Sequence, residues 1–225
     1  MKISISGHNG GIGTELQKQL KEKIDGCEIL GFSRTTGYDL QTQDGCDRMA
    51  KAASDSDIFI NCVFGGHAQT MALYRMWQEW DTQKKIICSI DSNAVDRLTH
   101  FPFPYAAWKA AHQRACNQLE QLHRPSQGVH CKVVYPQYGV VDTECSKRLI
   151  PQYNILKTIK VADAVKCAID LVMMNYNSDY YYPTIKMLPE EHINDCWVYM
   201  PEIIDQIDTS NYHASTTLTG GEAGN

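Results

Sequence analysis

The 225-residue sequence lacks any apolar run of about 18 residues, the length that a membrane-spanning helix needs. Its first six residues also lack the apolar stretch and the small-residue cleavage site of a secretory signal peptide. We therefore expect a cytoplasmic protein with no membrane partner. What is present agrees with this, because hydrophobic residues make up 43% of the chain and charged residues 21%, the balance of a soluble globular protein.

Residue spacings typical of disulfide frameworks and metal sites are missing as well. The nine cysteines are odd in number and irregularly spaced, and no C-x-x-C occurs. The eight histidines show no paired ligand spacing. We therefore expect reduced, structural thiols and no metal ion.

An excess of basic residues is also absent, since 21 Lys and Arg stand against 26 Asp and Glu, a net charge of -5. This balance argues against a nucleic-acid partner, because binding a phosphate backbone needs a broad basic surface. A phosphate-bearing small molecule needs only a local site and stays compatible with the charge.

Short apolar runs alternate with longer helical patterns up to about residue 175, which is typical of βαβ units on a parallel sheet. We predict an α/β protein with a Rossmann-type doubly wound parallel sheet in three α/β/α layers. A single domain would span residues 1–207, with a core over 1–175 and a strand-and-helix appendage over 176–207. Residues 208–225 would be a disordered tail. The predicted strands are 2–6, 27–32, a very short one at 38–40, 57–61, 85–90, 130–135 and a tyrosine-rich one from Tyr180. The predicted helices are 14–24, 43–54, 68–80, 104–122, 161–174 and one ending near Ile207.

Glycines gather directly after the first predicted strand, in the stretch Gly7-His-Asn-Gly-Gly-Ile-Gly13. Without Cβ atoms the backbone of such a turn can approach a pyrophosphate, and the next helix can pack tightly on the strand. The N-terminus of that helix offers unpaired N–H groups and a partial positive charge to the phosphates. The position between a strand and a helix favours a dinucleotide site over a merely flexible turn. The candidate contacts are Gly7, Asn9, Gly11, Ile12 and Gly13.

The acidic residue that takes the ribose hydroxyls in NAD-specific sites is missing from the end of the second strand. Ser33 and Arg34 stand there instead. An arginine fork with a neighbouring hydroxyl suits a 2′-phosphate, because it donates charge-assisted hydrogen bonds. We therefore predict a preference for NADP(H) over NAD(H), the alternative being an exposed, solvated arginine. Asp39, after the short third strand, would lie by the adenine.

Tyr105 and Lys109 lie four residues apart near the start of the helix predicted over 104–122. They share one face of that helix, so their functional groups bear on one site. A nearby ammonium favours the phenolate form of a tyrosine, which makes it a usable proton donor or acceptor. Tyr-x-x-x-Lys often occurs in helices by chance. The pair is evidence for a catalytic site only together with the residues around it.

Those surroundings are Ser92, which ends the fifth strand 13 residues before Tyr105, and Asn61, which ends the fourth. With the glycine turn, this set resembles the short-chain dehydrogenase/reductase family, NADP-preferring branch, over residues 1 to about 175. The family's Thr/Ser-Gly-x-x-x-Gly-x-Gly turn has its counterparts in Ser6, Gly7, Gly11 and Gly13.

The resemblance implies an NAD(P)-dependent oxidoreductase that reduces a carbonyl, or oxidises an alcohol, on a small organic substrate. Ser92 would hydrogen-bond the substrate oxygen and Tyr105 would transfer the proton. Lys109 would hold the nicotinamide ribose and assist the tyrosine. Further cofactor contacts implied by the resemblance are Asn61, Pro136 and Thr143, besides Tyr105 and Lys109 themselves.

The sequence departs from the family pattern at three places. The Asn61-Cys-Val-Phe64 stretch keeps only the first asparagine of Asn-Asn-Ala-Gly, and Gln137 replaces the glycine of Pro-Gly. The stretch from Asn61 to Ser92 is short and contains no counterpart of the family's helix-four asparagine, which supports a proton-relay water. His67 and Gln69 lie in it, and either could substitute for that asparagine, but we expect an ordinary surface role for both. Residues 35–37 leave no room for a helix between the second and third strands.

Two other functions remain open at this point. One is a cofactor-binding sensor or scaffold that performs no turnover. The other is an enzyme that uses its bound cofactor transiently, as sugar-nucleotide epimerases and dehydratases do, although these usually carry a larger second part. The resemblance also implies a homodimer or homotetramer. The identity of the substrate does not follow from the sequence.

Overall fold

Five parallel strands form the central sheet of the protein, in the order β2-β1-β3-β4-β6. The computed structural model describes residues 1–96, 104–149, 157–178 and 180–188. All five strands fall within ranges predicted as strands, because each is the short apolar run that a doubly covered sheet requires. They are β1 (Lys2–Ser6), β2 (Glu28–Phe32), β3 (Ile58–Asn61), β4 (Ile86–Ser89) and β6 (Lys132–Val134).

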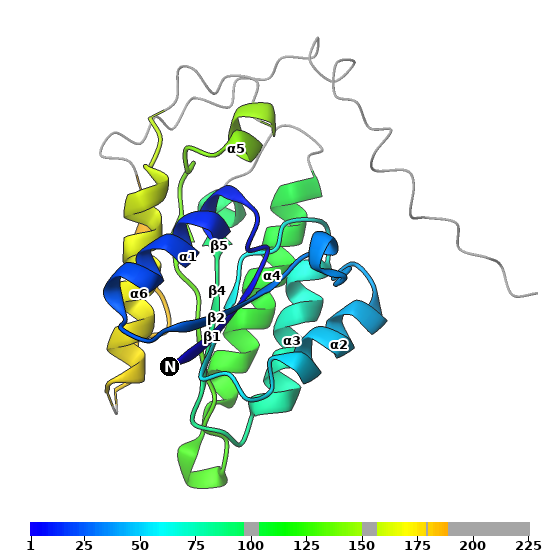
Figure 1. The fold of residues 1–225 in the computed structure, drawn as a ribbon, viewed down its shortest axis with the longest axis vertical. Helices are drawn as coiled ribbons and strands as arrows, with labels where there is room; N and C mark the ends of the chain where they lie inside the picture. Colours follow the sequence, from blue (N-terminus) through cyan, green and yellow to red (C-terminus); the bar gives the residue numbers. More distant parts are fainter. Residues whose placement is uncertain (97–103, 150–156, 179, 189–225) are drawn as a thin grey trace, which may run out of the picture.

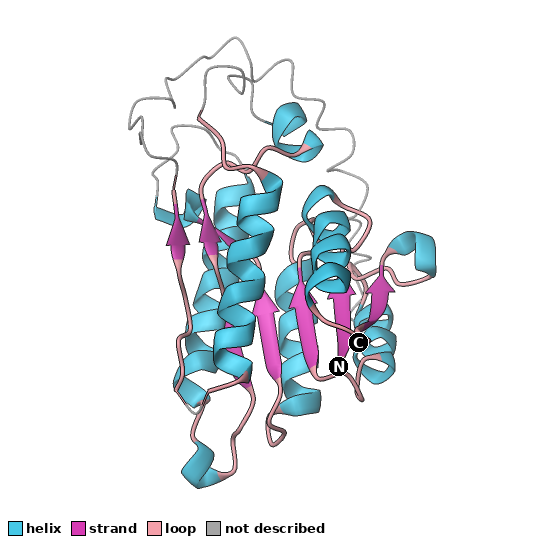
Figure 2. Cartoon of the chain, turned by 60° about the vertical axis from the view of Figure 1, so that its left-hand side comes forward, coloured by secondary structure: helices cyan, strands magenta, loops and turns pink. Residues whose placement is uncertain are grey.

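Helices cover both faces of this sheet, which confirms the predicted three-layer arrangement (Figures 1 and 2). One face carries α1 (Gly11–Lys23) and α6 (Val161–Tyr176), which pack against each other. The other face carries α2 (Gln43–Ala52), α3 (Ala68–Trp80) and α4 (Pro104–Leu122).

Successive side chains of each strand enter two separate hydrophobic cores, as the pleat of a strand requires. Ile3 and Ile5 of β1 lie in the core beneath α1 and α6. Phe59 of β3 and Ile87 of β4 lie in the core beneath α2, α3 and α4. Trp80 is fully buried in that second core, and its indole N–H donates to the Ser54 carbonyl oxygen at 3.1 Å.

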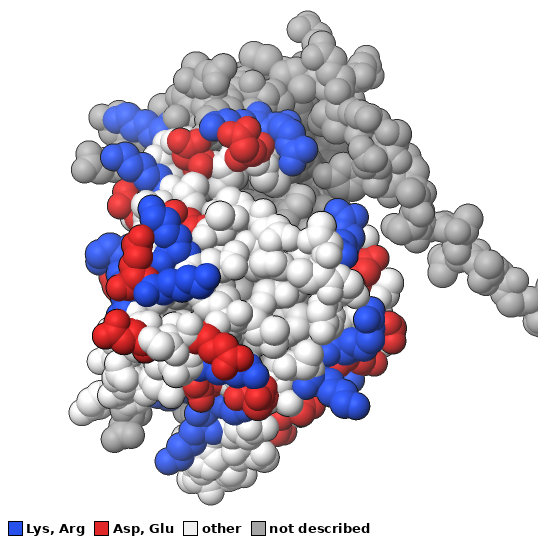
Figure 3. Space-filling model, in the orientation of Figure 1, with Lys and Arg blue, Asp and Glu red and all other residues white. Residues whose placement is uncertain are grey.

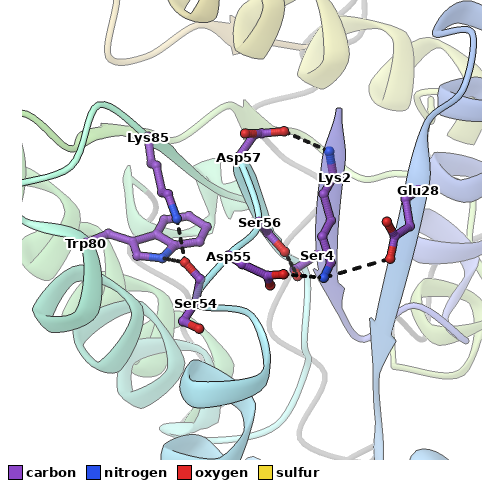
Figure 4. Close-up of polar contacts among 9 residues, drawn as sticks. All are labelled: Lys2, Ser4, Glu28, Ser54, Asp55, Ser56, Asp57, Trp80 and Lys85. Carbon is purple, nitrogen blue, oxygen red and sulfur yellow. Dashed lines mark hydrogen bonds and ion pairs between the residues drawn. The ribbon is translucent and has the colours of Figure 1, made fainter.

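Polar contacts join β1 and the segment that leads into β3 at the amino edge of the sheet (Figure 4). The backbone N–H of Lys2 donates to Asp57 Oδ2 at 2.8 Å. The buried hydroxyls of Ser4 and Ser56 lie 2.7 Å apart. These contacts fix the register of the two strands, so that their carboxyl ends come out level on the opposite edge.

A second, three-stranded parallel sheet lies beyond the carboxyl ends of β4 and β6. Its strands are β5 (Asp91–Ser92), β7 (Gln137–Tyr138) and β8 (Lys186–Met187). The Asp91 N–H donates to the Pro136 carbonyl oxygen at 2.9 Å, which ties the two crossing segments together. β5 follows β4 after one residue, so Ser92 lies just past the carboxyl end of the main sheet.

The very short strand predicted at 38–40 is wrong. A 3-10 helix, η1 (Arg34–Thr36), follows β2, and Gly37 then takes a left-handed conformation with a φ of 87°. The Tyr38 N–H turns back to the Ser33 carbonyl oxygen at 2.9 Å. Leu40 is buried in the core beneath α2, so this segment closes a turn and leaves β2 as the last strand of the sheet.

The tyrosine-rich strand predicted from Tyr180 is also wrong, because the strand of this region is β8, further along the chain. Tyr181 contributes its side chain to the sheet instead of its backbone. Its hydroxyl donates to the Val133 carbonyl oxygen at 2.6 Å and accepts from the Val133 N–H at 3.2 Å. The helix predicted to end near Ile207 and the tail over 208–225 lie outside the described residues.

Charged side chains of both signs lie intermixed around the periphery of the face drawn in Figure 3, and an uncharged area occupies its centre. None of the helices within the described ranges combines the length and the apolar character needed to cross a membrane. All eight cysteines in the described part of the chain are free thiols.

Candidate cofactor and active site

The turn between β1 and α1 depends on two glycines that no larger residue can replace without backbone movement. Gly7 has a φ of +69°, and a Cβ on it would lie 2.7 Å from the carbonyl oxygen of Cys62. A Cβ on Gly13 would lie 2.3 Å from the carbonyl oxygen of Gly7. Because α1 begins at Gly11, its first N–H groups lie free of helical partners at this edge of the sheet. The turn has the open backbone and the helix N-terminus that suit a pyrophosphate.

Thr143 lies against this turn although it is far away in the sequence. A Cβ on Gly11 would lie 3.3 Å from Thr143 Cγ2. The Thr143 hydroxyl accepts from the Ser146 N–H at 3.1 Å and so caps α5 (Glu144–Leu149). Ile12, the remaining predicted contact in the turn, packs partly buried against the core beneath α1 and α6.

A group of hydroxyls collects where β2 ends, within reach of the glycine turn. Asn9 Nδ2 donates to Thr35 Oγ1 at 2.6 Å and to Ser33 Oγ at 3.2 Å. The hydroxyls of Ser33 and Thr35 lie 2.8 Å apart. Arg34 is exposed between them, at the first position of η1. The structure brings Asn9, Ser33 and Arg34 together, as predicted. It adds Thr35, which the sequence analysis missed. The run of hydroxyl-bearing residues in Ser33-Arg-Thr-Thr36 was the sequence feature that could have indicated it.

Asp39 lies in the turn that leads into α2. Its carboxylate accepts from the Gln41 N–H at 3.1 Å, and its carbonyl oxygen accepts from the hydroxyl of Thr42 at 2.8 Å. Thr42 in turn caps α2 by accepting from the Gly45 N–H at 3.0 Å. The contacts of Asp39 therefore stabilise the start of α2. This residue lies one turn after the hydroxyls of Ser33 and Thr35 at the end of β2.

Asn61, a predicted cofactor contact, is fully buried, with an exposed fraction of 0%. Its Oδ1 accepts from the Ser6 hydroxyl at 2.8 Å, and its Nδ2 donates to the Gln69 carbonyl oxygen at 2.8 Å. With both ends of the amide engaged, Asn61 joins β1, β3 and α3 from behind the site. The next residue, Cys62, donates to the Ser6 carbonyl oxygen at 2.8 Å, and burial raises the pKa of its thiol to about 12.

Tyr105 and Lys109 occupy successive turns near the start of α4, which packs against β5 and the 3-10 helix η2 (Asn93–Asp96). Lys109 Nζ lies 5.9 Å from the centroid of the Tyr105 ring. The Phe64 ring lies tilted against that of Tyr105, with 5.8 Å between the two ring centroids. Ser92 is the last residue of β5, and its hydroxyl accepts from the Ala94 N–H at 3.2 Å. The structure therefore places the three predicted catalytic residues on two elements in contact.

Gln69 contradicts the expected surface role, because only 6% of it is exposed. Its Oε1 accepts from Lys109 Nζ at 2.7 Å. Its Nε2 donates to the carbonyl oxygens of Ile90 at 2.6 Å and Asn61 at 3.1 Å. His67 is exposed as expected and stands at the start of α3. The sequence signal for Gln69 was its place on the apolar face of α3, in line with Leu73, Met76 and Trp80.

His112 lies one turn beyond Lys109 and is buried between α4, α3 and β4. Its Nε2 lies 2.9 Å from the Ser89 hydroxyl, and its Nδ1 lies 3.4 Å from the Thr70 hydroxyl. Burial, with the charge of Lys109 as the second cause, lowers the pKa of His112 well below its usual value. The neutral ring holds α4 against the sheet and so fixes the helix that carries Tyr105 and Lys109.

Pro136 and Gln137 form the crossing between β6 and β7. Gln137 is buried, and its Nε2 lies 3.4 Å from Asp91 Oδ2 on the neighbouring strand. Gln137 is paired with Asp91 in the second sheet, whereas Ser92 is paired with Tyr138. Within the described ranges, no three His, Cys, Asp or Glu side chains are grouped so as to hold a metal ion.

No family sequence profile and no curated protein matches the chain, whereas solved structures do. A short-chain dehydrogenase from Burkholderia cenocepacia J2315, solved in complex with NADP, aligns with a TM-score of 0.64 and 16% identity over 95% of each chain. A short-chain dehydrogenase/reductase from Vibrio parahaemolyticus gives 0.65 and 15% identity, over 84% of this chain and 100% of that one. The 3-alpha-hydroxysteroid dehydrogenase from Pseudomonas sp. B-0831, complexed with NADH, gives 0.58 and 15%, over 84% and 95%.

At identities this low the likeness concerns the fold. It extends over nearly the whole length of each of these proteins and includes the parallel sheet flanked by helices. The predicted fold class is thereby confirmed, and the chain has the fold of the short-chain dehydrogenases.

Proposed function

We propose that this chain is an NADP(H)-dependent oxidoreductase of the short-chain dehydrogenase/reductase family. It would reduce a carbonyl group, or oxidise the corresponding alcohol, on a small organic substrate. The observation that carries the proposal is the position of Tyr105 and Lys109 on α4 against the strand that bears Ser92. Proteins of the same fold that were solved with NADP or NADH support a nicotinamide cofactor.

The residues of the glycine turn fit a dinucleotide. The space that a Cβ would fill at Gly7 and Gly13 is taken by neighbouring backbone, so the turn is tightly packed, while Asn9, Gly10 and Gly11 are exposed at its surface, where phosphates could approach. Beside it, the hydroxyls of Ser33 and Thr35 and the exposed guanidinium of Arg34 would hold a 2′-phosphate. This set of donors favours NADP(H) over NAD(H).

The chain's own residues would divide the chemistry between them. When bound, the nicotinamide supplies or accepts the hydride at the substrate carbon. The Tyr105 hydroxyl would give a proton to the substrate oxygen, or take one from it, while the Ser92 hydroxyl donates a hydrogen bond to the same oxygen. One hydride to carbon and one proton to oxygen convert a carbonyl into an alcohol. The Lys109 ammonium, 5.9 Å from the Tyr105 ring, would stabilise negative charge that develops on the tyrosine oxygen.

Phe64 gives the candidate site one apolar wall. Its ring is 48% exposed and leans on the ring of Tyr105. An apolar group of the substrate, next to the reacting carbonyl, would cover this exposed ring and gain from its burial. We therefore propose hydrophobic or aromatic carbonyl compounds as the first substrates to screen.

Replacing Tyr105 by phenylalanine tests the proposal. The reductase should lose turnover in an NADPH-oxidation assay with a panel of carbonyl compounds, by about 10²-fold or more, because the positioned proton donor is gone. Its NADPH affinity, measured by fluorescence titration, should stay within a few-fold of the unchanged protein.

Tyr176→Phe, the same change on the exposed end of α6, is the matched control and should retain full turnover. If the protein binds NADPH tightly but turns over no compound in the panel, the proposed reductase is wrong and a cofactor-binding sensor or scaffold is the better assignment. Equal turnover in both variants would remove Tyr105 from the chemistry.

A further inference from the structure

We infer that Gln69 is a positioning residue that clamps the ammonium of Lys109, so that only one N–H of this ammonium is left for a ligand. The inference rests on the proposed function, in which Lys109 serves Tyr105 and the cofactor. It assigns to α3 a direct part in arranging the site, through a side chain that no substrate needs to touch.

The contacts around the two side chains form a closed set. Lys109 Nζ donates to Gln69 Oε1 at 2.7 Å and to the Ile90 carbonyl oxygen at 2.8 Å. Gln69 Nε2 donates to that same carbonyl oxygen at 2.6 Å and to the Asn61 carbonyl oxygen at 3.1 Å. Gln69 lies on α3, Lys109 on α4, Asn61 at the end of β3 and Ile90 between β4 and β5, so four parts of the fold meet in this set, and two oxygens hold the ammonium itself.

Counting donors shows what remains for a ligand. An ammonium has three N–H groups, and two of those on Lys109 end on protein oxygens. A glutamine amide has two N–H groups, and both of those on Gln69 are also engaged. The third N–H of Lys109 is the one available for the ribose of a cofactor.

The orientation of the Gln69 amide follows from the same contacts. Turning it over would set its NH2 group against the ammonium and its oxygen against two carbonyl oxygens, so three attractive contacts would become repulsive. Asn61 also fixes the backbone of Gln69, because its side-chain Nδ2 donates to the Gln69 backbone carbonyl oxygen at 2.8 Å. A single arrangement therefore satisfies every buried group in the set.

The clamp also accounts for a missing part of the family pattern. No asparagine lies between Asn61 and Ser92 to support a water on the lysine. Gln69 instead reaches the ammonium directly, from the first turn of α3. Two protein oxygens therefore hold the Lys109 ammonium directly.

A double-mutant cycle distinguishes this role from a merely structural one. Gln69→Leu should lower kcat by about tenfold or more, since displacing a catalytic group by about 1 Å costs up to 10²-fold. In a Lys109→Met background the same change should have less than about a twofold effect, because residues that act through one another are not additive. Independent structural damage would instead multiply the two losses.

Two further variants complete the experiment. Gln69→Glu keeps an acceptor for Lys109 while it loses both donors, so it should retain more turnover than Gln69→Leu; the reverse order would contradict the clamp. This isosteric variant also serves if Gln69→Leu does not fold. Thr70→Val, the next residue of α3, removes a contact to His112 and should lower the melting temperature while leaving kcat unchanged.

The outcome is separable from that of the proposed function. If the wild type turns over carbonyls and Lys109→Met lowers kcat, yet Gln69→Leu leaves kcat unchanged or the two losses multiply, the inference fails and the function stands. If the wild type has no turnover, the proposed function fails, and the same cycle is read on the NADPH dissociation constant. Gln69→Leu should then weaken NADPH binding only where Lys109 is present; equal binding by all four proteins overturns the inference.

Discussion

Gly13→Ala adds one methyl group at the closest backbone approach in the candidate cofactor site. The new Cβ would lie 2.3 Å from the Gly7 carbonyl oxygen and 2.7 Å from His8 Cα. Both are backbone atoms, so no side chain can rotate away to make room. The turn and the first turn of α1 have to move apart.

The size of the effect follows from two opposing contributions. Adding a methyl group to a packed site costs about 1–3 kcal/mol, and contact with rigid backbone points to the upper end. Alanine favours a helix over glycine by about 1 kcal/mol, which offsets part of this cost. We expect a net loss of about 2 kcal/mol, which lowers Tm by about 4–8 °C in a chain of this size. NADPH affinity should fall by about tenfold or more, equal to about 1.4 kcal/mol, because the displaced turn no longer fits the phosphates.

Thermal unfolding and an NADPH fluorescence titration measure the two losses. Gly10→Ala is the matched control, since Gly10 has a φ of -80° and a Cβ there would lie at an ordinary 3.4 Å from the Gly7 oxygen. As an N-cap change it should cost less than about 1 kcal/mol and leave NADPH binding nearly intact. Gly13→Ala behaving like Gly10→Ala in both assays would refute the close approach.

Arg34→Ala should weaken NADPH binding by about tenfold or more and leave NADH binding nearly unchanged, because only the 2′-phosphate loses a charge-assisted partner. Arg114→Ala, an exposed arginine on α4, is its control, and equal affinities for the two cofactors in the unchanged protein would contradict the assignment of Arg34. For His112, whose pKa is lowered by burial, the unfolded state binds a proton that the folded state does not. The free energy of unfolding should therefore fall as the pH drops below about 6.5, by up to about 1.4 kcal/mol per pH unit, in urea titrations. His112→Gln should reduce this pH dependence of the unfolding free energy. An unchanged pH dependence would show that His112 is not its cause.

The elements of the main sheet and its covering helices could be predicted because each has a strong local pattern. β3 is an unbroken apolar run, and α6 repeats its apolar residues at helical spacing, so tertiary contacts reinforce what the local pattern already favours. The glycine turn was predictable for the same reason, since its function depends on residues that are adjacent in the sequence.

The errors lie where distant contacts decide the conformation. Tyr38 has a side chain suited to a strand, yet its ring packs edge-on against Phe32 and beneath the Arg48 guanidinium. Tyr181 likewise serves as a hydrogen-bonding side chain for Val133. In both cases the tyrosine contacts a partner elsewhere in the sequence, and no local pattern reveals that partner.

The candidate site likewise contains residues that local sequence predicts and one that it does not. Tyr105 and Lys109 were predictable because they share one helix, and Ser92 because it ends a strand. Gln69 was given a surface role because its partners, Lys109 and the Ile90 carbonyl group, come together only in the folded chain. Its place on the apolar face of α3 was the one local sign of burial.

The most direct test of the central claim is the transfer of deuterium from NADPH labelled at the hydride position to a carbonyl substrate, followed by mass spectrometry of the alcohol. We predict one deuterium atom on the former carbonyl carbon with the unchanged protein, and loss of labelled product with Tyr105→Phe. Alcohol that forms without deuterium, or labelled product that forms equally well with Tyr105→Phe, would contradict the proposed reaction.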